Sequence, residues 1–202
     1  LGDSYYDAQL MDMSVFEAGL KAQEEGYDAV CIDTVSDSGM YALRSRLSIP
    51  VLGPGQAAFH VACMLGHKFS IITMWDEWFH LYRKVLSEYK LEARCASMRS
   101  IDTRPDLAEL LAGKEEVIFK KLESEALKAI EEDKADVIVL GSTTMHQSHA
   151  FLQQALPVPV INPGLISYKL CEMFLETGLC HSERAFPAPQ QPNDDLVLSR
   201  NN

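Results

Sequence analysis

Two turns in the sequence pair a hydroxyl side chain with the expected start of a helix. The first turn, TVSDSG (34–39), follows the β-rich run DAVCID (28–33), and the second turn, STTMH (142–146), follows DVIVLG (136–141). The first amides of a helix lack partners within it, and they favour a nearby anion. We therefore expect the two turns to bind a carboxylate or a polarised carbonyl group.

Acidic and basic side chains beside the two hydroxyls are candidates for moving a proton. Asp33 precedes Thr34, Asp37 follows it on the same loop, and His146 lies four residues after Ser142. That spacing puts His146 on the same side of a helix as Ser142, where an imidazole can activate a hydroxyl or share its proton. The candidate catalytic residues are Thr34, Ser142, Asp33, Asp37 and His146. The candidate substrate-binding residues are Val35, Ser36, Thr143, Thr144, Gly53 and Pro163.

Structural roles compete with these functional ones. Serine and threonine often cap helix N-termini, and capping alone would explain Thr34 and Ser142. Asp33 equally suits a carboxylate buried against a backbone amide, and His146 suits an ordinary position on a helix surface. Both readings stay open from the residues alone.

An internal repeat relates the two turns. The run YDAVCIDT (27–34) matches ADVIVLGS (135–142), and IPVLGPG (49–55) matches VPVINPG (158–164). The offset between the copies is 108 residues for the first motif and 109 for the second. Similar α/β units tend to pack about a pseudo-twofold axis, and ligands bind beyond the carboxyl ends of parallel strands. Thr34 and Ser142 are therefore expected on opposite sides of one cleft.

The elements that must position these turns alternate between strand and helix patterns. Apolar runs at 28–33, 49–53, 69–74, 136–141 and 158–162 are typical of strands covered on both faces. Helical patterns lie between them, from residues 13–26 to residues 164–177, and the segment 91–105 fits a strand followed by a loop. The alternation predicts an α/β fold with parallel sheets flanked by helices. We expect two pseudosymmetric lobes, one from 1–66 plus 164–202, with a first strand possibly missing, and one from 67–163.

Composition excludes several classes of function. The chain has 202 residues and a formal charge of −11, which argues against nucleic-acid binding. No apolar run reaches the roughly 20 residues of a membrane span. The five cysteines form no CxxC pair and no cluster with metal-ligand spacing, which predicts a cytoplasmic protein without a metal. The Met and aromatic residues at 59–82 suit an interface in a homo-oligomer.

The ordered motifs resemble those of the aspartate/glutamate racemase superfamily, and in particular its hydantoin and allantoin racemase branch. LGHKFSIITM (65–74), ADVIVLGSTTM (135–145) and VPVINPG (158–164) carry the resemblance, which extends over roughly residues 20–180. It implies two lobes with the site between them and activity without a cofactor. It also implies a reaction at a carbon next to a carbonyl or carboxylate of a small nitrogenous substrate, such as a carboxylate or a cyclic amide.

The sequence departs from that family at the reacting groups. Family racemases carry a cysteine in each turn, one for each face of the substrate carbon, whereas Thr34 and Ser142 stand at those positions here. A thiol has a pKa near 8.5 and can take and return a proton, but a hydroxyl is a far weaker acid. We therefore expect racemase or isomerase chemistry without the two-cysteine route. The alternatives are a lyase, decarboxylase or hydrolase on the same scaffold, or a catalytically silent binding protein.

Overall fold

The computed structural model of the protein describes residues 2–104 and 115–198. In chain order, its helices and strands are α1 (Tyr5–Gly19), β1 (Val30–Cys31), α2 (Met40–Arg44), β2 (Val51–Leu52), α3 (Pro54–Leu65), β3 (Phe69–Thr73), η1 (Asp76–Trp78), α4 (Phe79–Glu88), η2 (Glu92–Arg94), β4 (Cys95–Ser100), α6 (Glu115–Glu131), β5 (Val137–Leu140), η3 (Thr143–Met145), α7 (His146–Ala155), β6 (Val160–Ile161), α8 (Pro163–Thr177) and α9 (Asp195–Leu198). Strands and helices alternate over most of the chain, as the apolar runs predict.

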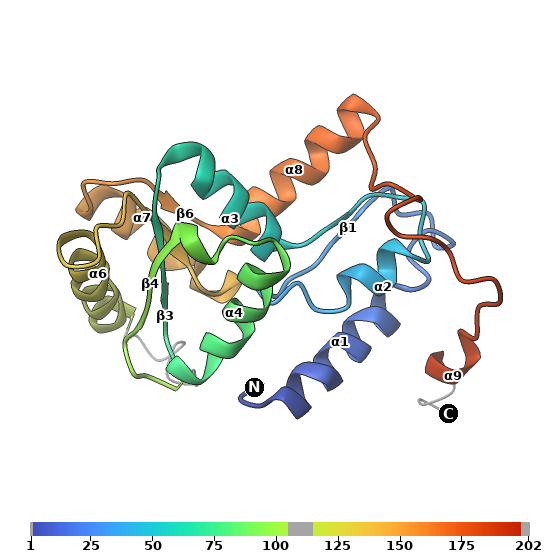
Figure 1. The fold of residues 1–202 in the computed structure, drawn as a ribbon, viewed down its shortest axis with the longest axis horizontal. Helices are drawn as coiled ribbons and strands as arrows, with labels where there is room; N and C mark the ends of the chain where they lie inside the picture. The colour runs from blue at the N-terminus through green and yellow to red at the C-terminus, as the bar shows by residue number, and fades with distance from the viewer. Residues whose placement is uncertain (1, 105–114, 199–202) are drawn as a thin grey trace.

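The larger sheet has four parallel strands in the order β4-β3-β5-β6 (Figure 1). Its side chains alternate between two helical layers. Along β5, Ile138 and Leu140 pack with α6 and α7, whereas Val137 and Val139 pack with α3 and α4. Every residue of β5 is therefore buried, which explains why this strand is apolar throughout.

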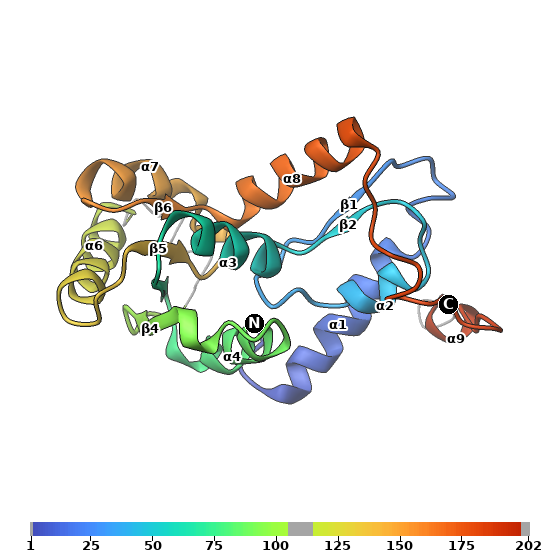
Figure 2. The ribbon, with the colours of Figure 1, turned by 45° about the horizontal axis from the view of Figure 1, so that its top comes forward.

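A smaller sheet of β1 and β2 lies beside the larger one, and its two strands are also parallel. Helices α1 and α2 cover one side of it through a cluster that contains Phe16, Leu43 and Val51. Helices α3 and α8 pack side by side between the two sheets, and α8 also packs along β1 and β2 (Figure 2). These two helices occupy matching positions in the internal repeat, so the pair joins the two copies.

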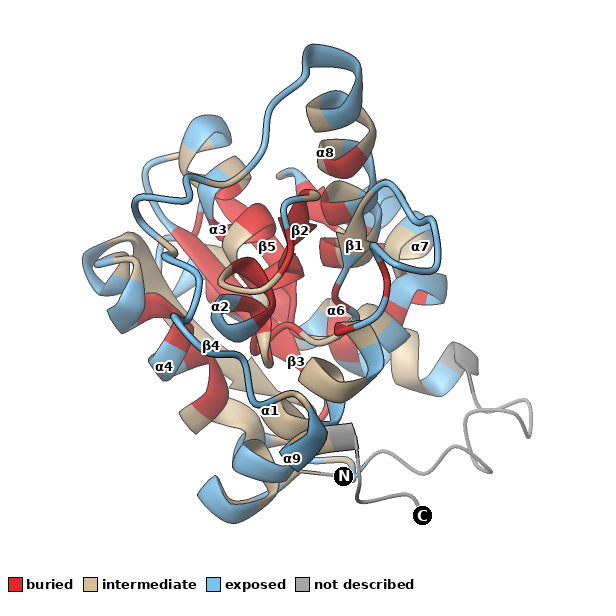
Figure 3. Ribbon diagram, turned by 90° about the vertical axis from the view of Figure 1, so that its right-hand side faces the viewer, coloured by how far each residue is buried: buried red, intermediate tan, exposed pale blue. Residues whose placement is uncertain are grey.

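Buried residues concentrate in the strands and in the inner faces of the helices around them (Figure 3). The expected α/β class with parallel sheets flanked by helices is confirmed, while the boundaries of the two lobes stay a prediction. Among the described residues, no helix is both long and apolar enough to cross a membrane.

Two elements differ from the sequence pattern. Helix α1 starts at Tyr5 rather than near residue 13, because the Ser4 hydroxyl accepts a hydrogen bond from the Asp7 amide at 3.2 Å and caps the helix there. The helical patterns end with residues 164–177, but the structure has a further short helix, α9, which packs against α1. Arg46 makes an ion pair with Asp194 at 2.5 Å, just before that helix.

Candidate active site

The first and second turns meet in the structure. The Thr143 hydroxyl in the second turn donates a hydrogen bond to the backbone carbonyl of Asp33 at 3.2 Å. Because neighbouring Cα atoms are only about 3.8 Å apart, this contact brings Thr34 and Ser142 close together. Both residues are partly exposed. The internal repeat thus places its two hydroxyl-bearing turns at one junction, on carboxyl ends of parallel strands.

Both hydroxyls cap the turn that follows them. The Thr34 hydroxyl accepts a hydrogen bond from the Ser38 amide at 3.2 Å, and the Ser142 hydroxyl accepts one from the Thr144 amide at 3.3 Å. The capping role that the sequence suggests for Thr34 and Ser142 is therefore present in both copies of the internal repeat. A hydroxyl that accepts in this way still has its own proton, which Thr34 can donate to a ligand. The Ser142 hydroxyl also lies 2.8 Å from the Thr144 hydroxyl, and one of the two donates to the other.

The turns also present backbone amides. Within the described part of the chain, the amides of Val35, Ser36 and Thr143 have no hydrogen-bond acceptor. Donors of this kind suit the negative charge that develops on a carbonyl oxygen. The arrangement can therefore bind a carboxylate or stabilise an enolate-like anion.

Asp37 is buried, with 5% of its surface exposed, and its carboxylate caps another helix. The two carboxylate oxygens accept hydrogen bonds from the amides of Gly55 and Gln56, each at 2.7 Å, at the start of α3. Gly53, the N-cap residue of α3, has no side chain to do this, and a Cβ there would lie 2.4 Å from the Asp37 carboxylate. Asp37 therefore ties the first turn to α3 and has both oxygens engaged.

Stability should depend on pH through Asp37. Burial outweighs the two amide hydrogen bonds and raises the pKa of Asp37 from 3.8 to about 7. The folded protein therefore binds more protons than the unfolded chain between these values, and this group's stabilising contribution is lost as the pH rises from about 4 to 7. We expect the free energy of unfolding of wild type, relative to Asp37→Asn, to fall by on the order of 4 kcal/mol over that range, as measured by urea unfolding at pH 4.5 and 8.

Asp136 provides a matched control with the opposite sign. Its carboxylate also accepts two backbone amides, from His67 at 2.9 Å and Lys68 at 3.0 Å. It is exposed, and those hydrogen bonds lower the pKa of Asp136. Wild type should therefore have a higher free energy of unfolding than Asp136→Asn above the pKa that the carboxyl group has in the unfolded chain. This difference should disappear as the pH falls. Equal pH profiles for the two variants would contradict the contrast between buried and exposed carboxylates.

The other candidates for proton transfer are accessible. The side chains of Asp33 and His146 are exposed, the first beside Thr34 and the second at the start of α7. His149, one turn further along α7, places its Nε2 3.0 Å from the carbonyl oxygen of Val160. Of the three predicted acids and bases, Asp33 and His146 can reach a ligand, whereas Asp37 is enclosed.

Pro163, the last candidate for substrate binding, is buried at the first position of α8. Asn162 precedes it and caps α8 by accepting a hydrogen bond from the Leu165 amide at 3.3 Å. The neighbouring Gly164 lies close to Thr143, whose methyl carbon would be 3.5 Å from an added Cβ. Helix α8 thus begins directly beside the second turn.

A buried hydrogen-bond network that no sequence pattern indicates lies below the second turn. The Tyr82 hydroxyl donates to the carbonyl of Gly141 at 2.6 Å and lies 2.9 Å from the Thr73 hydroxyl. Burial raises the pKa of Tyr82, so the hydroxyl stays protonated. The network fixes the peptide that leads into Ser142. An amphipathic helix pattern assigns Tyr82 only to the core, so this role could not be read from spacing.

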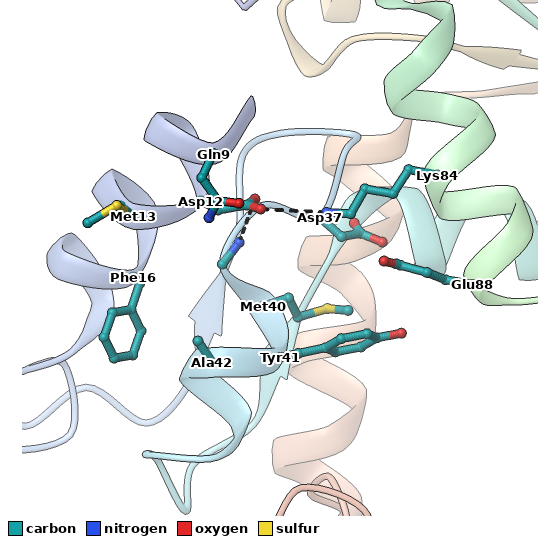
Figure 4. A pocket seen from close by; sticks show the side chains of 11 residues that line it. Gln9, Asp12, Met13, Phe16, Asp37, Met40, Tyr41, Ala42, Lys84 and Glu88 are labelled. Atoms are coloured by element: carbon teal, nitrogen blue, oxygen red, sulfur yellow. Dashed lines mark hydrogen bonds and ion pairs between the residues drawn. The ribbon is translucent and has the colours of Figure 1, made fainter. Parts of the chain in front are cut away.

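A cavity of about 270 Å³ lies on the other side of Asp37, between α1, α2 and α4 (Figure 4). Asp12 on α1 accepts a hydrogen bond from the Gly39 amide at 3.1 Å and faces Lys84 of α4 at 3.6 Å. Neither Thr34 nor Ser142 lines this cavity. It is therefore separate from the junction of the two turns. Within the described residues, no group of three or more His, Cys, Asp or Glu side chains could hold a metal ion.

Comparison with known proteins covers most of the chain. A sequence profile described as Asp/Glu/hydantoin racemase matches residues 3–171. A hydantoin racemase from Pseudomonas sp. (strain NS671) is 30% identical over 176 residues, which are 87% of this chain and 70% of the relative. A hydantoin racemase from Rhizobium meliloti is 33% identical over 165 residues, which are 81% of this chain and 66% of the relative.

Among solved structures, an allantoin racemase from Klebsiella pneumoniae superposes with a TM-score of 0.85 and 29% sequence identity. The match covers 94% of this chain and 76% of the racemase. This chain therefore spans about two thirds to three quarters of the length of these three relatives.

Proposed function

The chain belongs to the Asp/Glu/hydantoin racemase family, and from this premise we propose that it moves a proton at a carbon next to a carbonyl group of a small nitrogenous substrate. The family supports an enzyme of the racemase and isomerase type that acts on a small molecule. The substrate class that we propose is a hydantoin or allantoin, because relatives at about 30% identity carry those names. We propose that the reaction needs no cofactor.

The observation that carries the proposal is the contact between the two turns. The Thr143–Asp33 hydrogen bond joins the segments that stand where the family carries its reacting groups. In our proposal the amides of Ser36 and Thr143 receive the carbonyl oxygen of the substrate. Loss of one such donor typically costs about 3 kcal/mol of transition-state stabilisation, so two of them can support an enolate-like intermediate.

The hydroxyls and the proton-moving groups have different tasks in this proposal. Thr34 and Ser142 hydrogen-bond the substrate, because an unactivated hydroxyl is too weak an acid to exchange a proton with carbon. Asp33 takes or returns the proton on the side of the first turn, and His146 does so on the side of the second. Racemisation needs one group on each face of the carbon, and these two exposed side chains come from different turns.

A binding protein is the alternative that a specific observation favours. The hydroxyls of Thr34 and Ser142 each accept a hydrogen bond from a backbone amide of the turn that follows. This capping alone would explain why the two residues are present. Under this alternative the same amides would hold a carboxylate or cyclic amide without reaction. The expectations of a homo-oligomer and of no nucleic-acid partner stay predictions.

Exchange in deuterated water separates these functions. We expect the protein to incorporate deuterium at the reacting carbon of allantoin or of a 5-substituted hydantoin faster than the buffer does, as measured by NMR. Asp33→Asn and His146→Asn should each lower the rate by about 10²-fold, the usual contribution of a positioned acid or base. His67→Asn is the control, because His67 is exposed just before β3, at the opposite ends of the strands.

Other outcomes of this experiment identify the alternatives. Release of carbon dioxide or ammonia, or addition of water to the substrate, would indicate a lyase or hydrolase, since exchange alone only replaces hydrogen by deuterium. A rise in melting temperature with ligand, but without exchange, would indicate a binding protein. Either result would overturn the proposed isomerisation while leaving the family assignment intact.

A further inference from the structure

Two cysteines that the proposed reaction does not use, Cys31 and Cys171, lie where β1 and α8 pack together, and their side chains interact. The Cys31 sulfur on β1 is 3.1 Å from the hydroxyl oxygen of Ser167 on α8. Cys171 follows Ser167 by one helical turn, so both side chains lie on the same face of α8. The Cys171 sulfur is 3.9 Å from the carbonyl oxygen of Val30, the residue before Cys31. Two sulfur atoms and two oxygen atoms of β1 and α8 thus lie close together.

The two thiols differ in their environment. Cys31 is exposed, whereas Cys171 is buried with 6% of its surface accessible. Hydrogen bonds from Cys171 and Ser167 lower the pKa of Cys31 to about 7 and, in return, the pairing raises the pKa of Cys171. The thiolate is the reactive form of cysteine. The accessible Cys31 thiol is therefore the more easily ionised of the two, whereas the buried Cys171 thiol stays protonated.

We propose that Cys31 and Cys171 are an oxidisable dithiol, in which Cys31 reacts first with a hydroperoxide and Cys171 resolves the product into a disulfide. The Cys31 thiolate attacks one peroxide oxygen and the O–O bond breaks, so that Cys31 becomes a sulfenic acid while the other oxygen takes a proton and leaves as an alcohol or, from hydrogen peroxide, as water. The Cys171 sulfur then attacks the Cys31 sulfur and displaces water. Two thiols lose two electrons and two protons, and the hydroperoxide is reduced.

The other cysteines provide internal controls. Burial raises the pKa of Cys63 and of Cys95, the latter to about 11, so both should react slowly. Cys180 is exposed, but its sulfur lies against the carbonyl oxygen of Ser48 and the ring of its neighbour His181 rather than a second thiol. Among the cysteines that the structure describes, Cys31 and Cys171 are the two whose pKa values respond to each other.

The test is peptide mapping of the folded chain after exposure to hydrogen peroxide. Thiols are blocked with iodoacetamide, and the protein is digested without reduction and analysed by mass spectrometry. We expect a mass loss of about 2 Da and a linked pair of peptides containing Cys31 and Cys171, both reversed by dithiothreitol. This loss should be at least about tenfold faster than modification of Cys63.

Single variants separate the two roles. Cys171→Ala should leave a sulfenic acid at Cys31, trapped by dimedone, and no linked peptide. Cys31→Ser should leave Cys171 reduced. If Cys171→Ala does not fold, Cys171→Ser keeps the polar contact and serves the same purpose. The proposal is overturned if folded wild type yields no linked peptide, or if Cys171 oxidises equally fast without Cys31.

Discussion

Placing a cysteine in each turn, with Thr34→Cys and Ser142→Cys combined, is expected to raise the rate of proton exchange at the substrate carbon by about 10²-fold or more. A thiol has an ordinary pKa near 8.5, and unpaired amides like those of the two turns lower it further. One sulfur, as a thiolate, could then take the proton from its face of the carbon, while the other, as a thiol, donates a proton to the opposite face. Deuterium incorporation into allantoin or a 5-substituted hydantoin measures the change.

The single variants are the controls for this prediction. Either cysteine alone serves only one face of the carbon. The fold-increase in exchange rate for each single variant should therefore be smaller than the square root of the fold-increase for the double variant. A pH profile should show the rate rising with formation of a thiolate, which no structural effect of the substitutions would produce. A folded double variant without increased exchange would mean that Thr34 and Ser142 do not face one substrate carbon.

Gly55→Ala is expected to destabilise the folded protein strongly. Gly55 is the second residue of α3, and a Cβ there would lie 2.2 Å from the carbonyl oxygen of Val35 and 3.1 Å from the Asp37 carboxylate. The nearest atom belongs to the backbone, so no side-chain rotation can relieve the clash. We expect a loss of about 3 kcal/mol or more in the free energy of unfolding, measured by urea denaturation followed by circular dichroism.

The internal repeat supplies a control at the matching position. Gly164 is the second residue of α8, and a Cβ there would meet its nearest neighbour, the Thr143 methyl carbon, at 3.5 Å. This is an ordinary contact distance. Gly164→Ala should therefore be neutral or stabilise the protein by up to about 1 kcal/mol, because alanine restricts the unfolded chain. Equal losses for the two variants would contradict the role of the close contact at Gly55.

The sequence predicts the parts of the fold that depend on burial. The buried strand β5 is apolar throughout and β3 is mostly apolar, so both stand out from the helical segments. Strand β4 lies at the edge of the sheet, is only partly buried, and carries polar residues such as Ser97 and Arg99. Its pattern is correspondingly weak, so the segment 91–105 stands out less clearly as a strand than the buried runs do.

The candidate site is predictable to a lesser degree. The repeat identifies Thr34 and Ser142 as related positions, and the family motifs indicate what stood there in relatives. Long-range contacts decide the rest. The contact of Asp37 with α3 and the contact of Tyr82 with Gly141 join residues far apart in the chain, and no local pattern predicts them.

The two copies of the repeat cap their matching helices by different means. In the second copy Asn162 caps α8 from its own chain position, whereas in the first copy Asp37 reaches across from the turn to cap α3. The hydrogen bonds of Asp37 consequently couple the first turn to α3, so that a displacement of one should displace the other. The second turn has no such linkage through a cap, so ligand-driven movement in this protein should be asymmetric, with α3 as the helix that transmits it.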